Sequence, residues 1–354
     1  MSHLKRPIVL TPGDPAGVGP EIIAKAFEEC PQITQDCFVI GHPQVMRRAA
    51  LRAGFSVDMP VVVIDDPQQA LALPPRCIAV LQTTEIDIDY QMGVVSAAAG
   101  AYAASAVEWA AQAALSGAVS AIVTAPMHKE ALAAAGEPYC RFPGHTEMLQ
   151  AIAARSLGVS PSELPVRMML ANRELRTILV SIHVPLSEAI DAVRQDEILE
   201  TLRIAHKAVG GLLQRRPRIA VAGLNPHAGE GGRFGREEIE QIIPAVAAAR
   251  EIGVDAIGPI SPDTVFMRAR TASGKRGEFD VVIAMYHDQG LIPVKYLGVD
   301  EGVNVTLGLP FVRTSPDHGT AFDIAGRGVA KPDSLIEAIR MARDFVGLRG
   351  VPTN

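Results

Sequence analysis

Short apolar runs rich in β-branched residues alternate along this chain with longer, helix-forming stretches. The runs Pro7–Thr11, Cys37–Gly41 and Cys77–Leu81 are too short for ordinary helices and are apolar throughout, which is typical of strands buried on both faces of a sheet. Between them lie longer segments such as the Ala-rich stretch Ser96–Ser116. Because strands that alternate with helices form βαβ units, the sequence predicts an α/β fold with helices on both faces of a largely parallel sheet.

A second series of alternating segments begins near Arg141, with no repeat and no long linker before it. A chain of 354 residues is long enough for about two domains and for a large buried core. The strands expected in this part are 165–170, 176–183, 217–225 and 279–288, and the helices are 195–214, 235–251 and 333–347.

Charge and cysteine usage exclude several classes of protein. The net charge is −6, from 33 basic and 39 acidic residues, and no basic cluster offers a footprint for nucleic acid. The first apolar run is only five residues long, too short for a signal peptide or a membrane span. The 4 cysteines contain no C-x-x-C pair, which argues against a thiolate zinc site and a disulfide framework. The sequence thus predicts a soluble cytoplasmic protein without membrane or nucleic-acid partners.

Several predicted strands end in polar, glycine-containing strings. Ligands of open α/β folds bind at the carboxyl ends of strands, so these strings are candidate site segments. The first, TPGDPAGVGPE, places glycines at Gly13, Gly17 and Gly19. This spacing differs from the G-x-G-x-x-G fingerprint of a Rossmann cofactor site, and no G-K-[ST] of a P-loop follows it. The other interpretation is a strand-to-helix turn that requires a positive φ angle.

Three of the nine histidines, His183, His227 and His287, directly follow apolar strands. Such residues can converge at one edge of a sheet, and three neutral imidazoles leave open coordination positions on a catalytic metal ion. The alternative for each is a hydrogen-bonded polar residue at a strand end. His206 lies within a predicted helix, where a surface or packing role is expected, and His3 and His42 have no informative context.

A second group of residues has the chemistry of a phosphate site. His145 and Thr146 belong to the string GHTE, whose glycine frees the backbone. Lys295 and Arg313 lie in apolar surroundings, which predicts partly buried cations in need of anionic partners, and Asn304 supplies an amide. The alternative for the two cations is ordinary surface charge.

Taken together, the strings resemble those of the 4-hydroxythreonine-4-phosphate dehydrogenase family. The motifs TPGDPAGVGPE, GHTE, HVPL, LNPHAGEGG, AMYHDQGL with its downstream lysine, and VNVTLGLPFVRTSPDHGTA occur in order from about Pro7 to Gly328, nearly the whole chain. The resemblance implies a fold similar to the isocitrate and isopropylmalate dehydrogenases, with two α/β lobes, a cleft between them, a non-Rossmann NAD or NADP site and a homodimer. The lobes expected are 1–135 with 305–354, and 136–304, the second carrying the metal ligands and dimer contacts.

The resemblance also implies a role for each candidate residue. His183, His227 and His287 would bind one divalent ion (Zn, Mg or Co), with ligands drawn from both subunits. His145, Thr146, Lys295, Asn304 and Arg313 would contact the substrate, and Lys295 or Asp263 would act as the catalytic base. The implied reaction is the oxidation and decarboxylation of 4-phosphohydroxy-L-threonine to 3-amino-2-oxopropyl phosphate, a step in pyridoxine biosynthesis.

Two segments depart from the pattern of the family. The stretch between Phe266 and Phe279 is longer and more basic than is common in the family, and Val299 stands where an aromatic residue is common. Both lie near the expected substrate pocket. The substrate alternatives are a related phosphorylated four-carbon acid such as threonate 4-phosphate, or a cyclic dihydrodiol. A metal-dependent hydrolase is the rival of a different class, and a non-catalytic phosphometabolite-binding protein is a third reading.

Overall fold

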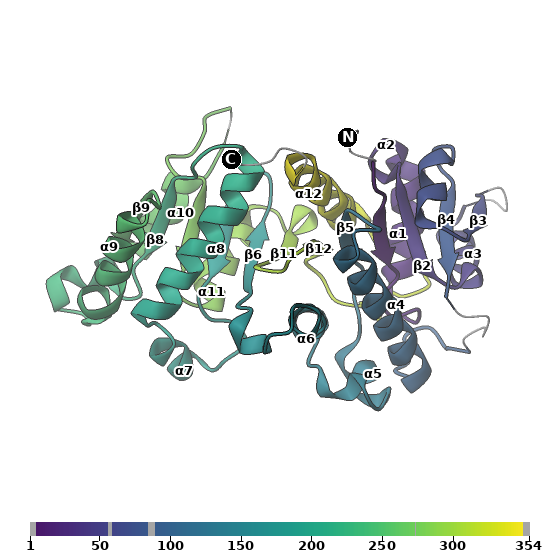
Figure 1. Cartoon of the computed structure of the whole chain (residues 1–354), viewed down its shortest axis with the longest axis horizontal. Helices are drawn as coiled ribbons and strands as arrows, with labels where there is room; N and C mark the ends of the chain where they lie inside the picture. Colours follow the sequence, from purple (N-terminus) through teal and green to yellow (C-terminus); the bar gives the residue numbers. More distant parts are fainter. Residues whose placement is uncertain (1–4, 56–58, 84–88, 273, 350–354) are drawn as a thin grey trace. The chain divides into compact units, whose positions relative to one another are not determined.

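The computed structural model describes residues 5–55, 59–83, 89–272 and 274–349 (Figure 1). The chain forms two compact units, one made of residues 5–164 and 309–349 and the other of residues 165–308. The sequence had suggested divisions after residue 135 and before residue 305. The observed boundary at residue 164 keeps the segment that contains His145 with the first unit.

The first unit is built on parallel strands in the order β3–β4–β2–β1–β5–β12. All of β1, β2 and β5 is buried, as their uniformly apolar sequences predicted. The strands are β1 (Ile8–Thr11), β2 (Cys37–Gly41), β3 (Val61–Ile64), β4 (Ile78–Gln82), β5 (Ala121–Thr124) and β12 (Val312–Pro316).

Helices of the first unit form two groups. Helix α1 (Gly19–Glu29) packs against α3 (Pro43–Arg52) and α12 (Asp333–Arg349), while α4 (Ala97–Leu115) packs against α5 (Lys129–Ala134) and α6 (His145–Leu157). Small side chains let α4 approach its neighbours closely, because a Cβ atom at Gly100 would lie 1.9 Å from the carbonyl oxygen of Ala131. Short α2 (Pro31–Thr34) follows α1. The α/β class predicted from the sequence is confirmed.

The second unit has a mixed sheet in the order β11–β6–β7–β10–β8–β9. Strand β6 runs antiparallel to β7 and β11, whereas β7, β10, β8 and β9 are mutually parallel. The strands are β6 (Arg167–Ala171), β7 (Arg176–Leu179), β8 (Ile219–Ala222), β9 (Ala256–Ile260), β10 (Val281–Ala284) and β11 (Val303–Leu307).

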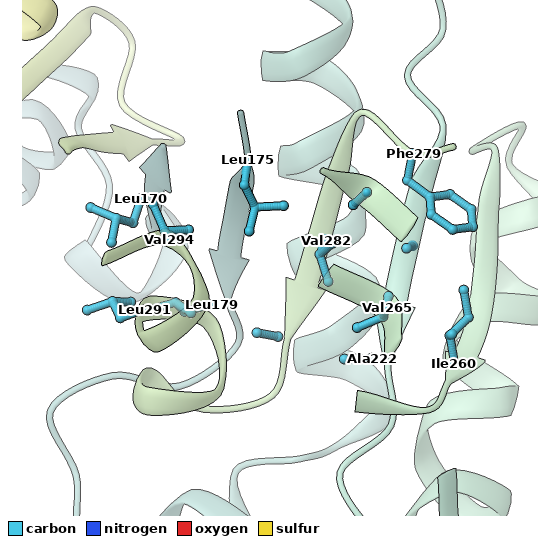
Figure 2. Close-up of a cluster of buried hydrophobic side chains, with 13 residues drawn as sticks. Leu170, Leu175, Leu179, Ala222, Ile260, Val265, Phe279, Val282, Leu291 and Val294 are labelled. Atoms are coloured by element: carbon cyan, nitrogen blue, oxygen red, sulfur yellow. The ribbon is translucent and has the colours of Figure 1, made fainter. Parts of the chain in front are cut away.

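The second unit has its core between this sheet and the helices α10 (Pro262–Ala269) and α11 (His287–Leu297) (Figure 2). Leu291 and Val294 of α11 pack against strand residues such as Leu170, and Val265 of α10 packs near Val282. The other long helix, α8 (Gln195–Leu213), packs with α9 (Ile243–Glu251). The helix α7 (Leu186–Asp191) follows β7. No helix in the described part of the chain has the length and apolar character needed to cross a membrane.

Two details of the fold differ from the sequence prediction. The motif VNVTLGLPFVRTSPDHGTA, in which the sequence predicts no strand, contains the whole of β11 and of β12. The helix expected from Gly235 begins later, with a π-helical turn, η5 (Glu238–Ile242), before α9. Gly235 itself has a φ of 144° and cannot belong to a right-handed helix.

Candidate functional site

The first unit has a topological switch point between β1 and β5. The chain leaves β1 toward β2 on one side, and β5 pairs with β1 on the other, so their carboxyl ends border a ligand-binding position of open α/β sheets. After β1, Gly13 has a φ of 69°, and a Cβ atom there would lie 2.1 Å from the carbonyl oxygen of Pro126. The interpretation of this string as a turn that requires a positive φ angle is confirmed at Gly13.

A buried arginine lies beside this switch point. Arg313 of β12 is only 5% exposed, and its Nη2 donates to Oγ1 of Thr124 at the end of β5 over 2.8 Å. Burial lowers the pKa of Arg313 to about 10, and the nearby Glu147 carboxylate acts in the opposite direction. A cation held in this environment favours an anionic ligand.

His145 lies at the first position of α6, next to the charge of Arg313. Burial and this guanidinium lower the pKa of His145 to about 3, so its imidazole is neutral at physiological pH. Its Nε2 atom is buried and has no hydrogen-bond partner in the described part of the chain. Thr146 follows in the first turn, where free backbone N–H groups and the helix dipole favour an anion. The first unit therefore brings His145 close to Arg313, with Thr146 next in the first turn of α6, and these groups are the candidates for holding an anion.

The other two predicted substrate residues belong to the second unit. Asn304 is partly exposed in β11, opposite Leu170 of β6. Lys295 lies in the last turn of α11 and is exposed, so the expectation of a partly buried lysine is wrong. Leu291 and Val294 form the part of α11 that packs on the sheet, and Lys295 lies about 100° around the helix from Val294, at the edge of this packed face.

The three histidines proposed as metal ligands follow three adjacent parallel strands. His183 follows β7, His287 follows β10 and His227 follows β8, and β10 pairs with both of the others. The rings of His183 and His287 have centroids 5.6 Å apart. Their strand ends are joined by Ser181, whose Oγ donates to the carbonyl oxygen of Met285 over 3.0 Å. The end of the sheet thus brings two imidazoles together.

The hydrogen bonds of His287 suit metal binding. Its Nδ1 lies 2.7 Å from Oδ1 of Asp288, and because a carboxylate only accepts, Nδ1 is the donor; in the neutral form of the ring, Nε2 would then keep its lone pair for a metal ion. The amide of Gln289 joins two strand ends: its Oε1 accepts from the N–H of Met285 over 2.7 Å, and its Nε2 donates to the carbonyl oxygen of Gly223 over 2.8 Å. This amide couples the turn of His287 to the turn of His227.

His227 lies in the turn η4 (Pro226–Gly232), where it has a φ of 54°. Its ring contacts Phe234, with centroids 6.5 Å apart. Asp263 lies near His227 at the start of α10, is exposed, and accepts a short hydrogen bond from the Ser261 hydroxyl. This hydrogen bond holds the pKa of Asp263 below its usual range, with a smaller contribution from His227.

The donor set fits a divalent ion in its chemistry. Two imidazoles lie side by side, one of them hydrogen-bonded to a carboxylate, and a third follows the neighbouring strand. Within the residues that the structure describes, however, no three histidine, cysteine or acidic side chains are close enough to hold a metal ion together. A complete coordination sphere therefore requires a donor beyond the two adjacent rings.

Sequence reasoning overlooked several polar groups of the first unit. The atoms Thr11 Oγ1, Asp14 Oδ2 and His128 Nδ1 are buried without hydrogen-bond partners in the described chain, and the His128 ring stacks on Phe322 with centroids 4.5 Å apart. Burial raises the pKa of Asp14. His42, for which the sequence offered no role, caps α3 by accepting from the N–H of Gln44. Only the position of these residues after strands could have indicated them.

The basic segment that departs from the family pattern is held by ion pairs. Arg268 Nη2 lies 2.6 Å from Glu278 Oε1, and Arg270 Nε lies 2.5 Å from Glu174 Oε2. Ser273 lies outside the described residues, as does the side chain of Val299.

Fold and site together define an α/β protein with ligand-binding groups at the carboxyl ends of its strands: an anion setting in one unit and paired imidazoles in the other. Residues 33–342 match the family of the pyridoxal phosphate biosynthetic protein PdxA. The chain belongs to this family, and it is a dehydrogenase. The resemblance inferred from the sequence motifs is confirmed.

Two relatives and one solved structure show how far the similarity extends. A 4-hydroxythreonine-4-phosphate dehydrogenase of Beijerinckia indica is 48% identical over 353 residues, which cover 100% of this chain and 98% of the relative. A D-threonate 4-phosphate dehydrogenase of Pectobacterium atrosepticum is 42% identical over 336 residues, covering 95% of this chain and 98% of the relative. The crystal structure of the Klebsiella pneumoniae 4-hydroxythreonine-4-phosphate dehydrogenase is 41% identical, with a TM-score of 0.84 over 97% of this chain and 100% of that one.

The lowered pKa of His145 predicts a specific effect of acid. The pKa of His145 is about 3 in the folded chain, whereas the ordinary pKa of a histidine is 6.5. Between these pH values the unfolded state therefore binds more protons than the folded state. The free energy of unfolding consequently falls as the pH falls through this range. We therefore expect the free energy of unfolding to decrease less, between about pH 7 and about pH 5, in a His145→Gln variant than in the wild type. Urea unfolding at both pH values measures this, with the exposed His318→Gln as control. Equal decreases in the wild type and His145→Gln would contradict the prediction.

Proposed function

We propose that this dehydrogenase oxidises 4-phosphohydroxy-L-threonine with NAD or NADP and a divalent metal ion. The oxidised product then loses CO₂ to give 3-amino-2-oxopropyl phosphate. The observation that carries the proposal is the 48% identity, over 100% of the chain, to a relative that bears the name of this activity. The motifs for the phosphate and the metal both lie within the matched region.

The phosphate of the substrate is proposed to bind at the start of α6. Arg313 supplies a buried positive charge that is already oriented by Thr124, and the N-terminal turn of α6 supplies backbone N–H donors. The Nε2 of His145 is buried without a partner, so it is available to a bound group. Because His145 is neutral, the charge that attracts the phosphate comes from Arg313 and the helix dipole.

His183 and His287 are proposed to hold the metal ion together with His227. When bound, a divalent ion supplies Lewis-acid chemistry that lowers the pKa of the substrate hydroxyl. The two adjacent rings need a further donor, since no group of three candidate ligands exists among the described residues of this chain. We therefore propose that the chain acts as a homodimer in which the partner subunit completes the site.

Proton removal is assigned to Lys295 or Asp263. Lys295 lies two helical turns after His287 on α11, about 12 Å along the helix axis, and its long side chain is exposed. Asp263 is ionised at neutral pH, because the Ser261 hydroxyl holds the pKa of its carboxyl down, and it lies near His227. The substrate would lose its hydroxyl proton to one of these groups and a hydride to the nicotinamide. The resulting β-keto acid then decarboxylates.

A second substrate is supported by the relative from Pectobacterium atrosepticum. That protein is named for D-threonate 4-phosphate and is 42% identical over 95% of this chain, close to the values for the relatives named for 4-hydroxythreonine 4-phosphate. The two substrates share the phosphate and the oxidised hydroxyl, so the same residues would serve both.

Turnover with the two substrates side by side tests the choice between them. We expect the purified, metal-loaded enzyme to form NADH faster with 4-phosphohydroxy-L-threonine than with D-threonate 4-phosphate. The rate of absorbance increase of the reduced nicotinamide measures both reactions. Faster oxidation of D-threonate 4-phosphate would replace the proposed substrate, and the absence of NADH with either would reject this function.

Shortening the proposed phosphate contact should weaken substrate binding. An Arg313→Lys variant keeps the positive charge but loses the guanidinium fork, and we expect KM for the phosphorylated substrate to rise about ten- to a hundredfold. Steady-state kinetics at saturating NAD measures the change. The exposed Arg155→Lys on α6 is the matched control and should retain the wild-type KM. An unchanged KM in Arg313→Lys would contradict the phosphate assignment.

Removing one of the adjacent imidazoles should remove the metal ion. We expect His287→Ala to lower affinity for Co²⁺ by more than the roughly 10- to 100-fold typical of losing a group that only orients a ligand. Competition with a chromogenic chelator measures the affinity, and circular dichroism checks that the fold is kept. His206→Ala, on α8, is the control. Wild-type turnover of His287→Ala after dialysis against a chelator would refute the metal role.

A further inference from the structure

The turn that carries His227 has an unfavourable backbone conformation. Residues 227–231 all have positive φ angles, between 43° and 77°. Three of them, His227, Ala228 and Glu230, have side chains, and left-handed backbone is disfavoured for such residues. Consecutive residues in this region persist only when surrounding interactions impose the conformation. The structure must therefore contain groups that hold this turn.

Glu238, in the π-helical turn η5, is the side chain placed to do so. It is only 2% exposed. Its Oε1 accepts from the backbone N–H groups of Leu224 and Asn225 over 2.8 and 2.7 Å, and its Oε2 accepts from Nδ2 of Asn225 over 2.9 Å. All three donors belong to Leu224 and Asn225, two of the three residues between β8 and the turn η4. The carboxylate therefore fixes the point at which the turn leaves the strand.

Glycines make room for this carboxylate inside the turn. A Cβ atom at Gly229 would lie 2.6 Å from Oε2 of Glu238, and one at Gly223 would lie 3.2 Å from Oε1. The Gly223 position would also clash with Cα of Ala228, at 2.9 Å. The turn thus wraps around the carboxylate on both sides, and glycine at these positions keeps the backbone close to it.

The chemistry of the contact suits a carboxylate and no other side chain. The three hydrogen bonds of Glu238 are all accepted from amide groups, two of the backbone and one of the Asn225 side chain. A glutamine would retain the two backbone bonds through its oxygen, but its nitrogen would face Nδ2 of Asn225, donor against donor. A buried donor pair without an acceptor is unfavourable, so this exchange should loosen the turn while changing little of its shape.

We propose that Glu238 is a positioning residue, which holds the turn of residues 223–229 so that the His227 imidazole is presented to the metal ion. This inference rests on the proposed function, in which His227 is a metal ligand. Groups that orient a ligand in this way typically change metal affinity 10- to 100-fold when they are replaced. Glu238 does not contact the metal ion or the substrate in this proposal; it acts through the backbone that carries His227.

The test compares Glu238→Gln with Glu240→Gln in the full-length protein. Both variants remove one negative charge from the same helical turn, but Glu240 is exposed and pairs with Arg236 at 2.5 Å. Titration with Co²⁺, followed by its visible absorption, should give a dissociation constant about 10- to 100-fold higher in Glu238→Gln than in the wild type. Glu240→Gln should match the wild type. Activity of Glu238→Gln should recover at high Co²⁺ concentration with an unchanged KM for the substrate.

A second measurement separates positioning from general destabilisation. Amide hydrogen exchange of the metal-free protein should be faster at residues 224–234 in Glu238→Gln. Val209→Ala, which shortens a fully buried side chain on α8, should lower the melting temperature and leave Co²⁺ affinity unchanged.

The outcomes distinguish this inference from the function on which it rests. Wild-type Co²⁺ affinity in Glu238→Gln, with weak binding in His227→Ala, would overturn the role of Glu238 and leave His227 as a ligand. Equal Co²⁺ affinity in His227→Ala and the wild type would reject His227 as a ligand and the role of Glu238 with it. Weaker Co²⁺ binding in Val209→Ala to the same degree as in Glu238→Gln would show that destabilisation alone accounts for the effect.

Discussion

Parallel pairing of β10 with β7 and β8 is the interaction on which the candidate metal site depends. Ile283 pairs with both Ile178 and Val221, so the three strands end at nearly the same level of the sheet. The carboxyl ends of parallel strands emerge at one edge, and the histidine that follows each strand is therefore delivered to that edge. His183, His227 and His287 are separated by 44 and 60 residues in the sequence (227 minus 183, and 287 minus 227), and this pairing places all three after strands that end at one edge of the sheet.

Hydrogen bonds from side chains to the backbone hold the turns after these strands. Because the turns carry the histidines, these bonds restrict the positions that the imidazoles can take. Gln289 joins the end of β10 to Gly223, and Glu238 binds the N–H groups of the next two residues. Such bonds are strong inside a protein, where an unsatisfied amide is costly. These bonds hold several residues in the left-handed backbone conformation, which the same sequence would not keep as a free loop.

The candidate histidines of the two units differ in burial and in the charges around them. In the first, burial and then the neighbouring Arg313 guanidinium lower the pKa of His145, so that of these two residues only Arg313 is charged at neutral pH. In the second, His183 is exposed, His287 is partly exposed, and Nδ1 of His287 is hydrogen-bonded to Asp288. The different surroundings of these histidines come from burial and neighbouring charge rather than from the residue type itself.

Much of this protein followed from the sequence. The alternation of apolar runs with helix-forming stretches determined the α/β class, and the ordered motifs determined the family, because hydrophobic periodicity and motif spacing are properties of the chain itself. The histidines after strands and the glycine turn at Gly13 were likewise evident from local pattern.

Only the tertiary structure decided which of these groups meet and how each is oriented. The exposure of Lys295 depends on which face of α11 packs on the sheet. The burial of Arg313 depends on the elements that surround β12, a strand that the sequence did not predict. The role of Glu238 depends on a turn 9 to 15 residues before it folding back around its carboxylate. Such contacts join residues at irregular distances along the chain, so no periodic pattern in the sequence indicates them. They can be identified only once the strands and helices are placed in space.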